Sequence, residues 1–511
     1  MIVVGGPPGV GKTTVARHAA LRWGSVAIDL DTQLEERLGR TVATLIRESG
    51  EDAFRDAERD ALGSVDPSRA AVLALGGGTL VRPESARAAR RLGPVVGLVA
   101  SPEVLDRRVS ADATDRPLQR PSSELLDKRR EAYASVDFDV AAEDDADVVA
   151  ANVEARTKDT VTLECPVGDV QTRVIVGRNL IDAVRGAVAV QRPTRPVVVV
   201  LDAKVPAARR SAIVAGIEAL YPVVTIEVEG GEAVKTWSVL EDVTERALAA
   251  GAGRQSVVVG VGGGATTDLA GLVASMLGRG AALVLVPTTV LSQVDAAVGG
   301  KCAINSRSGR NLIGAFHAAQ DVVVDLDALP SLDPAEMRNG LAEMLKMGIL
   351  ADASLFDRIV EAGAPDVASI ARSIELKAQI VASDPYERGA RKTLNLGHTL
   401  AHALETASDH TLRHGEAVAI GLCAAARYSA ALGLAHPDVV ARIEAGIARV
   451  GLPTHSPEGL DDRAAAALGH DKKSGSTQID FVAIRTLEEV QLVALSLEEV
   501  RRELIRHGGR S

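Results

Sequence analysis

Four of the ten histidines in this chain of 511 residues lie between positions 398 and 414. His398 and His402 are spaced i, i+4, so on a helix both imidazoles would lie on one face. Imidazole is the commonest protein ligand for zinc, and a catalytic zinc site usually has three protein ligands. His410, His414 or a carboxylate could supply the third. In a chain this poor in histidine, the cluster indicates a metal or catalytic site rather than a helix with a few core or exposed histidines.

A second group of chemistry-bearing residues lies near the N-terminus. The β-branched run 2–4 leads directly into Gly6-Pro-Pro-Gly-Val-Gly11-Lys12-Thr13-Thr14, and a helical pattern follows. A glycine-rich loop between a strand and a helix is the Walker A arrangement, in which backbone N–H groups surround a phosphate. Lys12 would reach the β- and γ-phosphates, and the Thr13 hydroxyl would bind magnesium. The order strand, loop, helix favours a nucleotide site over a chance match.

The remainder of the first 152 residues predicts a parallel α/β domain around this loop. Predicted strands end at Asp29 and Asp31 and at Gly76-Gly77-Gly78. Carboxylates two residues apart on a strand lie on one side, where they could bind magnesium-linked water and a substrate hydroxyl; a plain polar strand end is the alternative. Arg55 and the arginines of the polar segment 107–130 suit phosphate and carboxylate groups, and this segment could act as a lid.

The second half predicts a Rossmann-like parallel sheet followed by a helical region. Strand patterns at 196–201, 223–228 and 256–261 alternate with helical patterns, and the third opens into Gly262-Gly263-Gly264. Such a glycine run suits either a dinucleotide or a plain tight turn from strand to helix. From about residue 329 the pattern is helical to the end.

Polar residues in this half occur in apolar surroundings. Glu343 and Lys346 lie one helical turn apart in an apolar helix, which favours a functional pair over a plain i, i+3 salt bridge. A glycine-rich, otherwise apolar stretch carries Asp295, Lys301, Arg310 and Asn311. Isolated polar residues make a poor core, so this stretch indicates an anion pocket.

Charge and cysteine content narrow the function classes. The net charge of −11 leaves no basic excess for neutralising nucleic-acid phosphates, so no nucleic-acid partner is expected. The three cysteines are far apart, which suits a reducing cytoplasm. The N-terminal residues lack the pattern of a signal peptide, and no apolar run is long enough to cross a bilayer. These features predict a cytoplasmic protein that acts on small molecules and has no membrane partner.

Residues 1–152 resemble shikimate kinase. The matching pieces are the Walker A loop, Asp29-Leu-Asp31, Phe54-Arg55, Gly76-Gly77-Gly78, Arg116-Pro117, and Arg129 four residues before Tyr133. The resemblance implies phosphoryl transfer from ATP, with Mg²⁺ on Thr13, to the 3-hydroxyl of shikimate. It implies that ATP is bound by Gly9, Val10, Gly11, Lys12, Thr13, Thr14 and Arg108. It implies that shikimate is bound by Asp31, Arg55, Gly77, Gly78 and Arg129. The catalytic residues implied are Lys12, Asp31 and Arg116.

From about residue 160 to 490 the chain resembles 3-dehydroquinate synthase. The matching motifs include Gly262-Gly-Gly-Ala-Thr-Thr-Asp268, Val298-Gly-Gly-Lys301, Ala342-Glu343-Met-Leu-Lys346, Asn395-Leu-Gly-His398 and His414-Gly-Glu. The resemblance implies a tightly held NAD, a divalent metal (zinc or cobalt), and conversion of 3-deoxy-D-arabino-heptulosonate 7-phosphate into 3-dehydroquinate and phosphate. The zinc ligands implied are Glu343, His398 and His414. The NAD-binding residues implied are Asp202, Glu232, Lys235, Gly263, Gly264, Asp268, Thr288, Thr289, Lys301 and Arg310.

The same resemblance implies a set of substrate-binding residues. They are Arg279, Asp295, Lys301, Asn311, Lys346, Lys377, Arg391, Asn395, His402 and Lys472, of which Asp295, Lys301, Lys346 and His402 are catalytic. His402 would contact the substrate phosphate rather than the metal. Arg279 would come from a neighbouring subunit, which implies a homodimer through the synthase half. Two positions depart from the family pattern: Arg310 stands where lysine is usual, and Pro385 stands where an acidic residue often follows Asp384.

Together the two resemblances imply a fused, bifunctional enzyme of the shikimate pathway, which leads to chorismate and the aromatic amino acids. The expected α/β architecture has four parts: a P-loop kinase domain at 1–152, a linker at 153–159, a Rossmann-like NAD-binding domain at 160–328 and a mainly α-helical metal- and substrate-binding domain at 329–511. Two alternatives stay open. The C-terminal half could be another sugar-phosphate cyclase, acting on sedoheptulose 7-phosphate. One half could instead be a non-catalytic metabolite-binding or regulatory module.

Overall fold

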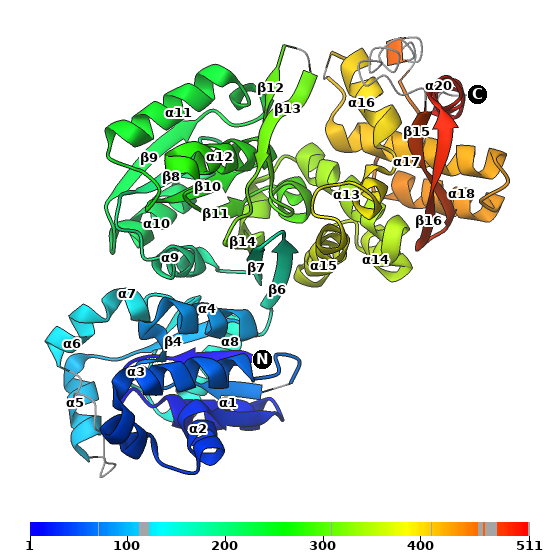
Figure 1. Cartoon of the computed structure of the whole chain (residues 1–511). Helices are drawn as coiled ribbons and strands as arrows, with labels where there is room; N and C mark the ends of the chain where they lie inside the picture. The colour runs from blue at the N-terminus through cyan, green and yellow to red at the C-terminus, as the bar shows by residue number, and fades with distance from the viewer. Residues whose placement is uncertain are drawn as a thin grey trace. The chain divides into compact units, whose positions relative to one another are not determined.

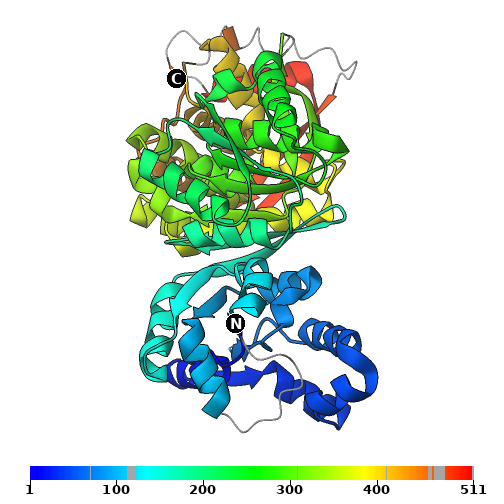
Figure 2. The same cartoon turned by 90° about the vertical axis from the view of Figure 1, so that its left-hand side faces the viewer.

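The computed structural model describes residues 1–69, 71–111, 122–307, 309–409, 411–457, 463–464 and 478–508. Figures 1 and 2 show the chain coloured from blue at the N-terminus to red at the C-terminus. Its contacts divide the chain into two compact units. The first unit holds Met1–Glu164, Thr172–Val286 and Cys302–Asp327, and the second holds Cys165–Gln171, Pro287–Lys301 and Ala328–Ser511. Among the described residues, no helix has both the length and the apolar character needed to span a membrane.

A five-stranded parallel sheet forms the N-terminal part of the first unit. Its order is β2 (Val26–Asp29), β3 (Ala71–Ala74), β1 (Ile2–Gly5), β4 (Val95–Val99) and β5 (Phe138–Ala141). The central β1 is flanked on both sides, with Val3 opposite Leu73 and Val95, and its β-branched side chains are buried. The helices that connect these strands are α1 (Lys12–Arg22), α2 (Leu30–Leu38), α3 (Val42–Gly63), α4 (Pro83–Leu92), α5 (Pro102–Ala111), α6 (Ser123–Lys128), α7 (Arg130–Tyr133) and α8 (Ala146–Thr157).

A seven-stranded sheet follows. Its order is β6 (Val161–Val167), β7 (Val170–Gly177), β14 (Asp321–Asp325), β11 (Ala282–Pro287), β10 (Val257–Gly262), β8 (Val197–Asp202) and β9 (Val223–Val228). The run of valines in β8 is buried throughout, as expected for a strand covered on both faces. Its helices are α9 (Ile181–Ala189), α10 (Ala207–Glu218), α11 (Trp237–Ala249) and α12 (Gly264–Met276), and β12 (Lys301–Ser306) pairs with β13 (Gly309–Phe316) as a separate ribbon.

One core of buried apolar side chains is shared by both sheets of the first unit. It includes Val4 and Phe138 from the first sheet and Ile175, Val184 and Val199 from the second part. Each of these side chains is fully buried. Because they share a core, the two sheets of this unit pack against each other and are not separate domains joined by a flexible linker.

The second unit is mainly helical (Figure 1). Glu343, His398 and His414, which were predicted as metal ligands, belong to it. Its longer helices are α13 (Pro334–Ala351), α14 (Ala353–Ala362), α15 (Val367–Ser383), α16 (His398–Ala407), α17 (His414–Ala431), α18 (Pro437–Arg449) and α20 (Leu497–Gly508). The predicted α/β class with a mainly helical C-terminal region is confirmed.

The prediction of a helical pattern to the very end is wrong in one segment. β15 (Gln478–Thr486) and β16 (Glu489–Ser496) form an antiparallel hairpin. Phe481 and Val482 of this hairpin are both buried, so tertiary packing adds to their own strand propensity as an aromatic and a β-branched residue.

Two candidate active sites

The glycine-rich loop joins β1 to α1. Gly11 has φ 98°, a left-handed backbone that glycine adopts at little cost, and a Cβ on Gly9 would lie 2.6 Å from Val109 Cγ2. Lys12 Nζ donates hydrogen bonds to the carbonyl oxygens of Gly6 and Pro7, each at 3.0 Å. The ammonium group therefore lies over the loop at the N-terminus of α1, an arrangement that suits an anionic phosphate.

Two further side chains reach this loop. Thr13 Oγ1 donates to Asp29 Oδ2 at 2.5 Å, which places the hydroxyl beside a carboxylate as a magnesium site requires. Arg108 of α5 donates from Nη1 to the carbonyl of Val10 at 3.3 Å and to that of Ala142 at 2.7 Å. Thr14 follows on α1 with an exposed side chain.

An arginine and several carboxylates form a second group in the same domain. The guanidinium of Arg55 is only 4% exposed and pairs with Glu58 Oε2 at 2.5 Å and Glu51 Oε1 at 3.0 Å. Arg55 lies directly over Gly78, where a Cβ would be 2.1 Å from Nη2. A Cβ on Gly76 would be 2.9 Å from Asp31 Oδ1. A larger residue at position 76 or 78 would displace these charged side chains.

Asp31 and the segment around Arg129 complete this group. Burial raises the pKa of Asp31 to about 7, and the negative charges of Glu58 and Asp29 add to the shift. A carboxyl group that titrates near neutral pH is suited to take up a proton during catalysis. Tyr133 donates its hydroxyl to the carbonyl of Gly77 at 2.9 Å and is hydrogen-bonded to Arg129.

The ends of β8 and β10 carry the predicted NAD-binding residues of the first unit. Asp202 accepts from Lys204 N at 2.9 Å and from Thr266 Oγ1 at 3.4 Å. A Cβ on Gly230 would lie 2.1 Å from Asp202 Oδ1, so the loop after β9 packs against this carboxylate. Gly263 directly precedes α12, which begins at Gly264. The start of a helix at the carboxyl end of a parallel strand is a favourable site for a pyrophosphate.

Ion pairs link the remaining polar residues of this region. Lys235 Nζ lies 2.6 Å from Asp268 Oδ2 and also donates to the side chain of Asn311. Glu232 accepts from Asn305 Nδ2 at 2.7 Å and from Arg310 Nε at 3.3 Å. The arginine at position 310 therefore keeps a charge contact with Glu232.

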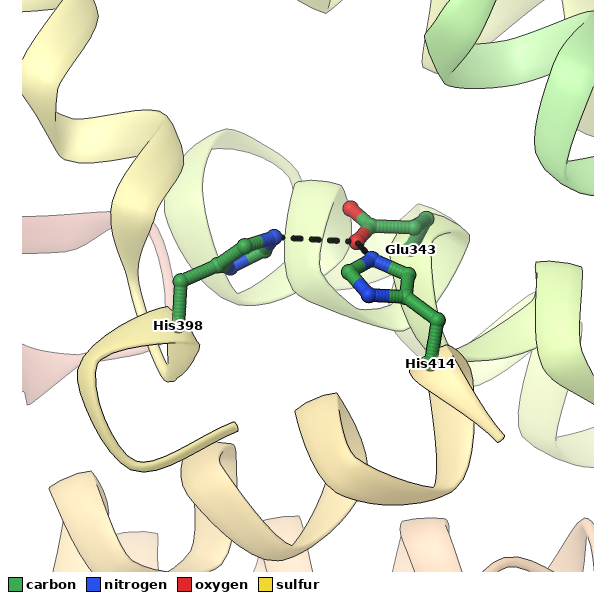
Figure 3. A group of neighbouring side chains, drawn as sticks. All are labelled: Glu343, His398 and His414. Atoms are coloured by element: carbon green, nitrogen blue, oxygen red, sulfur yellow. Dashed lines mark hydrogen bonds and ion pairs between the residues drawn. The ribbon is translucent and has the colours of Figure 1, made fainter. Parts of the chain in front are cut away.

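In the second unit, Glu343, His398 and His414 come together from three helices (Figure 3). Their candidate ligand atoms all lie within 4.8 Å of one another. Glu343 Oε1 lies 3.4 Å from His398 Nε2 and 3.2 Å from His414 Nε2. One carboxylate and two imidazoles, all aimed at one point, are a donor set that fits zinc or another divalent metal.

The second nitrogen of each imidazole has its own partner. His398 Nδ1 lies 3.1 Å from the carbonyl of Leu396, and His414 Nδ1 lies 3.5 Å from Glu405 Oε1. Such outer contacts orient the ring of a metal-ligating histidine. Burial alone would lower the pKa of His414. Its hydrogen bonds to Glu343 and Glu405 outweigh burial and raise this pKa to about 10. The pocket therefore favours positive charge at this position.

Buried cations surround this cluster. Lys346 Nζ lies 2.5 Å from Glu343 Oε2, and Lys377 Nζ lies 2.5 Å from Asp295 Oδ1. Burial alone would raise the pKa of Asp295, but the neighbouring positive charge of Lys377 lowers this pKa below its usual value. Burial lowers the pKa of Lys377, so its proton is released more easily than from a lysine in water. Arg391 donates to the carbonyls of Gly299 at 3.0 Å and Pro385 at 2.6 Å.

Comparison with known proteins decides the family. Residues 225–339 and 340–474 match the models of the N-terminal and C-terminal parts of 3-dehydroquinate synthase. The 3-dehydroquinate synthase of Bradyrhizobium sp. (strain BTAi1) is 40% identical over 353 residues, which cover 65% of this chain and 92% of that protein. The enzyme of Thermobifida fusca is 43% identical over 274 residues, covering 52% and 74%. The chain belongs to the 3-dehydroquinate synthase family.

The part of the chain that precedes the synthase has a family of its own. Residues 8–158 match the shikimate kinase model, so the chain is a fusion of a shikimate kinase and a 3-dehydroquinate synthase. A crystal structure of 2-deoxy-scyllo-inosose synthase with carbaglucose-6-phosphate, NAD⁺ and Co²⁺ is similar to the synthase part, with a TM-score of 0.61 and 26% identity over 67% of this chain and 100% of that one.

Not all predicted synthase residues lie in the second unit with the metal cluster. Arg279 is exposed at φ 65° and, like Asn311, belongs to the first unit. Thr288 and Thr289 follow β11 in the second unit, where the Thr289 hydroxyl bonds to Ser292. His402 is exposed, with its ring centroid 5.5 Å from that of His398. Arg116, His410 and Lys472 lie outside the described residues.

Three carboxylates at these sites escaped the sequence reasoning. Glu58 lies one helical turn after Arg55, and that spacing was the available signal. Glu405 lies two turns after His398 on α16, a spacing that places both residues on one face. Glu387 accepts from Asn395 Nδ2 at 3.1 Å and also pairs with Lys301, which lies 86 positions earlier in the sequence. Only the folded chain reveals that last contact.

Proposed function

We propose that both halves of this fusion are catalytically competent. The N-terminal half transfers phosphate from ATP to shikimate, and the C-terminal half converts 3-deoxy-D-arabino-heptulosonate 7-phosphate into 3-dehydroquinate and phosphate. The observation that carries the proposal is the cluster of Glu343, His398 and His414 beside buried lysines, in a chain with a separate Walker A loop. The predicted linker at 153–159 is wrong for its first five residues, because α8 (Ala146–Thr157) continues through them and Val153 is buried in the core. We therefore assign residues 1–158 to the kinase, 160–328 to NAD binding and 329–511 to the metal and substrate.

In the kinase, we assign Lys12 and Arg108 to ATP and Thr13 to its magnesium ion. Arg55 and Arg129 would bind the carboxylate of shikimate, because guanidinium groups form paired hydrogen bonds with carboxylates. Asp31 would accept the proton of the attacking hydroxyl, a task that suits a carboxyl with a pKa of about 7. Phosphoryl transfer needs little from the protein beyond such positioning and charge neutralisation.

In the synthase, the donor set of Glu343, His398 and His414 fits a divalent metal, and the glycine-rich turn before α12 fits the pyrophosphate of NAD. NAD supplies reversible hydride transfer, and the metal polarises the hydroxyl groups of the substrate. The similar 2-deoxy-scyllo-inosose synthase, which was solved with NAD⁺ and Co²⁺, supports this assignment.

The chain's own residues hold the substrate around that centre. Lys346, Lys377 and Arg391 would bind its carboxylate side, and they are all buried beside Asp295 or the metal cluster. Lys301 and Asn395 would bind its phosphate, since both now bond to the carboxylate of Glu387, which presents oxygen atoms much as a phosphate does. His402 would also face the phosphate.

We further propose a cytoplasmic homodimer. Cys165, Cys302 and Cys423 are buried and are not joined in disulfides in the part of the chain that the structure describes, which suits a reducing compartment. Arg279 is exposed, so its guanidinium group is available to a neighbouring subunit. Because the two reactions are not consecutive, the fusion does not imply transfer of an intermediate between the sites.

The substrate of the synthase half separates this proposal from the alternative cyclase activity. The intact protein with NAD⁺ and Zn²⁺ is incubated with heptulosonate 7-phosphate or with sedoheptulose 7-phosphate, and release of phosphate is measured. We expect turnover of the first sugar, because its carboxylate can bind to the buried cations Lys346, Lys377 and Arg391. Sedoheptulose 7-phosphate lacks this carboxylate. Turnover of sedoheptulose 7-phosphate alone would refute the assignment.

A further inference from the structure

The synthase half supplies a side chain to the shikimate-binding region of the kinase half. Both regions lie in the first compact unit. Arg192 follows α9 and donates from Nη2 to the carbonyl oxygens of Leu80 at 3.3 Å and Val81 at 3.1 Å. Its Nη1 lies 3.6 Å from Glu131 Oε2. One guanidinium thus joins two separate segments of the kinase.

Both segments adjoin residues that we assign to shikimate. Leu80 and Val81 belong to the short 3-10 helix η1 (Thr79–Val81), which directly follows Gly77 and Gly78. Glu131 lies on α7, two residues after Arg129. Across this region the segments are joined by Tyr133, whose hydroxyl donates to the carbonyl of Gly77 at 2.9 Å. Arg192 and Tyr133 therefore form two separate ties between the glycine loop and α7.

The part of the synthase that carries Arg192 is held firmly against the kinase. A Cβ on Gly186 of α9 would lie 1.9 Å from the carbonyl oxygen of Val136, so the helix and the kinase backbone are in close contact. The preceding residue, Arg185, pairs with Asp139 of β5 at 2.6 Å. Arg192 itself has φ 52°, a left-handed backbone that is unusual for a residue with a side chain.

A buried network of four charges fixes the same contact. Asp137 lies 3.0 Å from Arg90 and 2.7 Å from Arg173, while Asp321 lies 3.0 Å from Arg90 and 3.5 Å from Arg173. Asp137 and Arg90 belong to the kinase half, whereas Arg173 and Asp321 belong to the synthase half. Two positive and two negative charges balance, and none of the four side chains is more than 5% exposed. Separating them without partners would leave buried charges uncompensated, so the network favours one fixed arrangement.

We propose that Arg192 is a positioning residue for the shikimate site of the kinase. This inference rests on the proposed kinase function. By fixing η1 and α7 relative to each other, Arg192 holds Gly77, Gly78 and Arg129 at the spacing that shikimate requires. It does not touch the Walker A loop in the described structure, so its influence falls on shikimate rather than on ATP.

Steady-state kinetics on the full chain test this role. We expect Arg192→Ala to raise the KM for shikimate about tenfold, the scale of one lost charged hydrogen bond, and to leave the KM for ATP and the synthase activity within about twofold. Arg192→Lys should recover part of the loss, because an ammonium group can still donate to a carbonyl or pair with Glu131. Arg185→Ala is the matched control: it removes an ion pair of α9 with the kinase but leaves η1 and α7 untouched.

The outcomes separate the two claims. The inference is overturned if Arg192→Ala and Arg185→Ala raise the KM for shikimate equally. It is also overturned if Arg192→Ala raises the KM for ATP as much as the KM for shikimate, because Arg192 would then make only a structural contact. If Arg192→Ala does not fold, Glu131→Gln serves instead, with the same direction of change expected and an unchanged KM refuting the role. If the unsubstituted chain does not phosphorylate shikimate, the proposed kinase function falls, and this inference falls with it.

Discussion

Replacement of Asp31 by asparagine should stabilise the kinase domain while abolishing its activity. Burial raises the pKa of this carboxyl to about 7, from 3.8 in an unperturbed aspartate. The folded-state pKa lies above the unfolded value, so the folded protein keeps a proton that the unfolded chain has lost. The stability that protonated Asp31 contributes to the folded state is fully present below about pH 4 and is lost as the pH rises through about 7.

The size of the effect follows from the shift. Each pKa unit corresponds to about 1.4 kcal/mol, so a shift of about three units makes the ionised Asp31 cost about 4 kcal/mol above pH 7. At about pH 5.5 only about 2 kcal/mol of this cost is present, because Asp31 is still protonated in the folded state. Asp31→Asn removes the charge at all pH values. The stability gap between variant and wild type should therefore grow by about 2 kcal/mol between about pH 5.5 and pH 8.

Urea unfolding followed by tryptophan fluorescence measures this gap. The chain has two tryptophans; Trp237 is 57% exposed, whereas Trp23 packs against the core of the first unit. A Trp237→Phe background therefore leaves a reporter in the kinase. Asp127→Asn, at an exposed aspartate of the same domain, is the control and should show no growing gap. A gap for Asp31→Asn that is constant with pH would refute the reasoning, since it would mean that Asp31 titrates normally.

Three further predictions concern the two sites. Gly78→Ala should lower kcat/KM for shikimate by about a hundredfold, because its Cβ would lie 2.1 Å from Arg55 Nη2; Gly63→Ala, which meets nothing within 4 Å, is the control, and equal kinetics for the two would contradict the geometry. Glu405→Gln should weaken zinc binding about tenfold or more in a chelator competition, because it orients His414; unchanged affinity would exclude that role. Chelator treatment followed by excess Mg²⁺ should restore only the kinase activity, and full recovery of the synthase would argue against a transition-metal centre.

Local features of the sites were predictable from the sequence. The Walker A loop and the Gly76-Gly77-Gly78 turn depend on neighbouring residues, and Lys12 lies over its own loop as the motif requires. Spacing alone paired His398 with His402, and only the resemblance to the synthase family named His414 and the distant Glu343. The structure brings these last two together with His398, because α17 packs against both α13 and α16.

Contacts between distant segments were not predictable. Glu387 reaches Lys301 across 86 positions, and Arg192 reaches Leu80 across 112. No periodicity or motif records such pairs, since each depends on how whole helices and sheets pack. The hairpin β15–β16 was missed for a related reason: β15 packs against α17, and local propensity does not include that contact.

The central claim is that one chain carries two independent active sites, and a pair of variants tests it most directly. Kinase activity with shikimate and Mg-ATP and synthase activity with heptulosonate 7-phosphate are both measured on the intact chain, on Lys12→Ala and on His398→Ala. We expect Lys12→Ala to abolish only the kinase activity and His398→Ala to abolish only the synthase activity. Loss of both activities in either variant, or the absence of one activity from the unsubstituted chain, would contradict the claim.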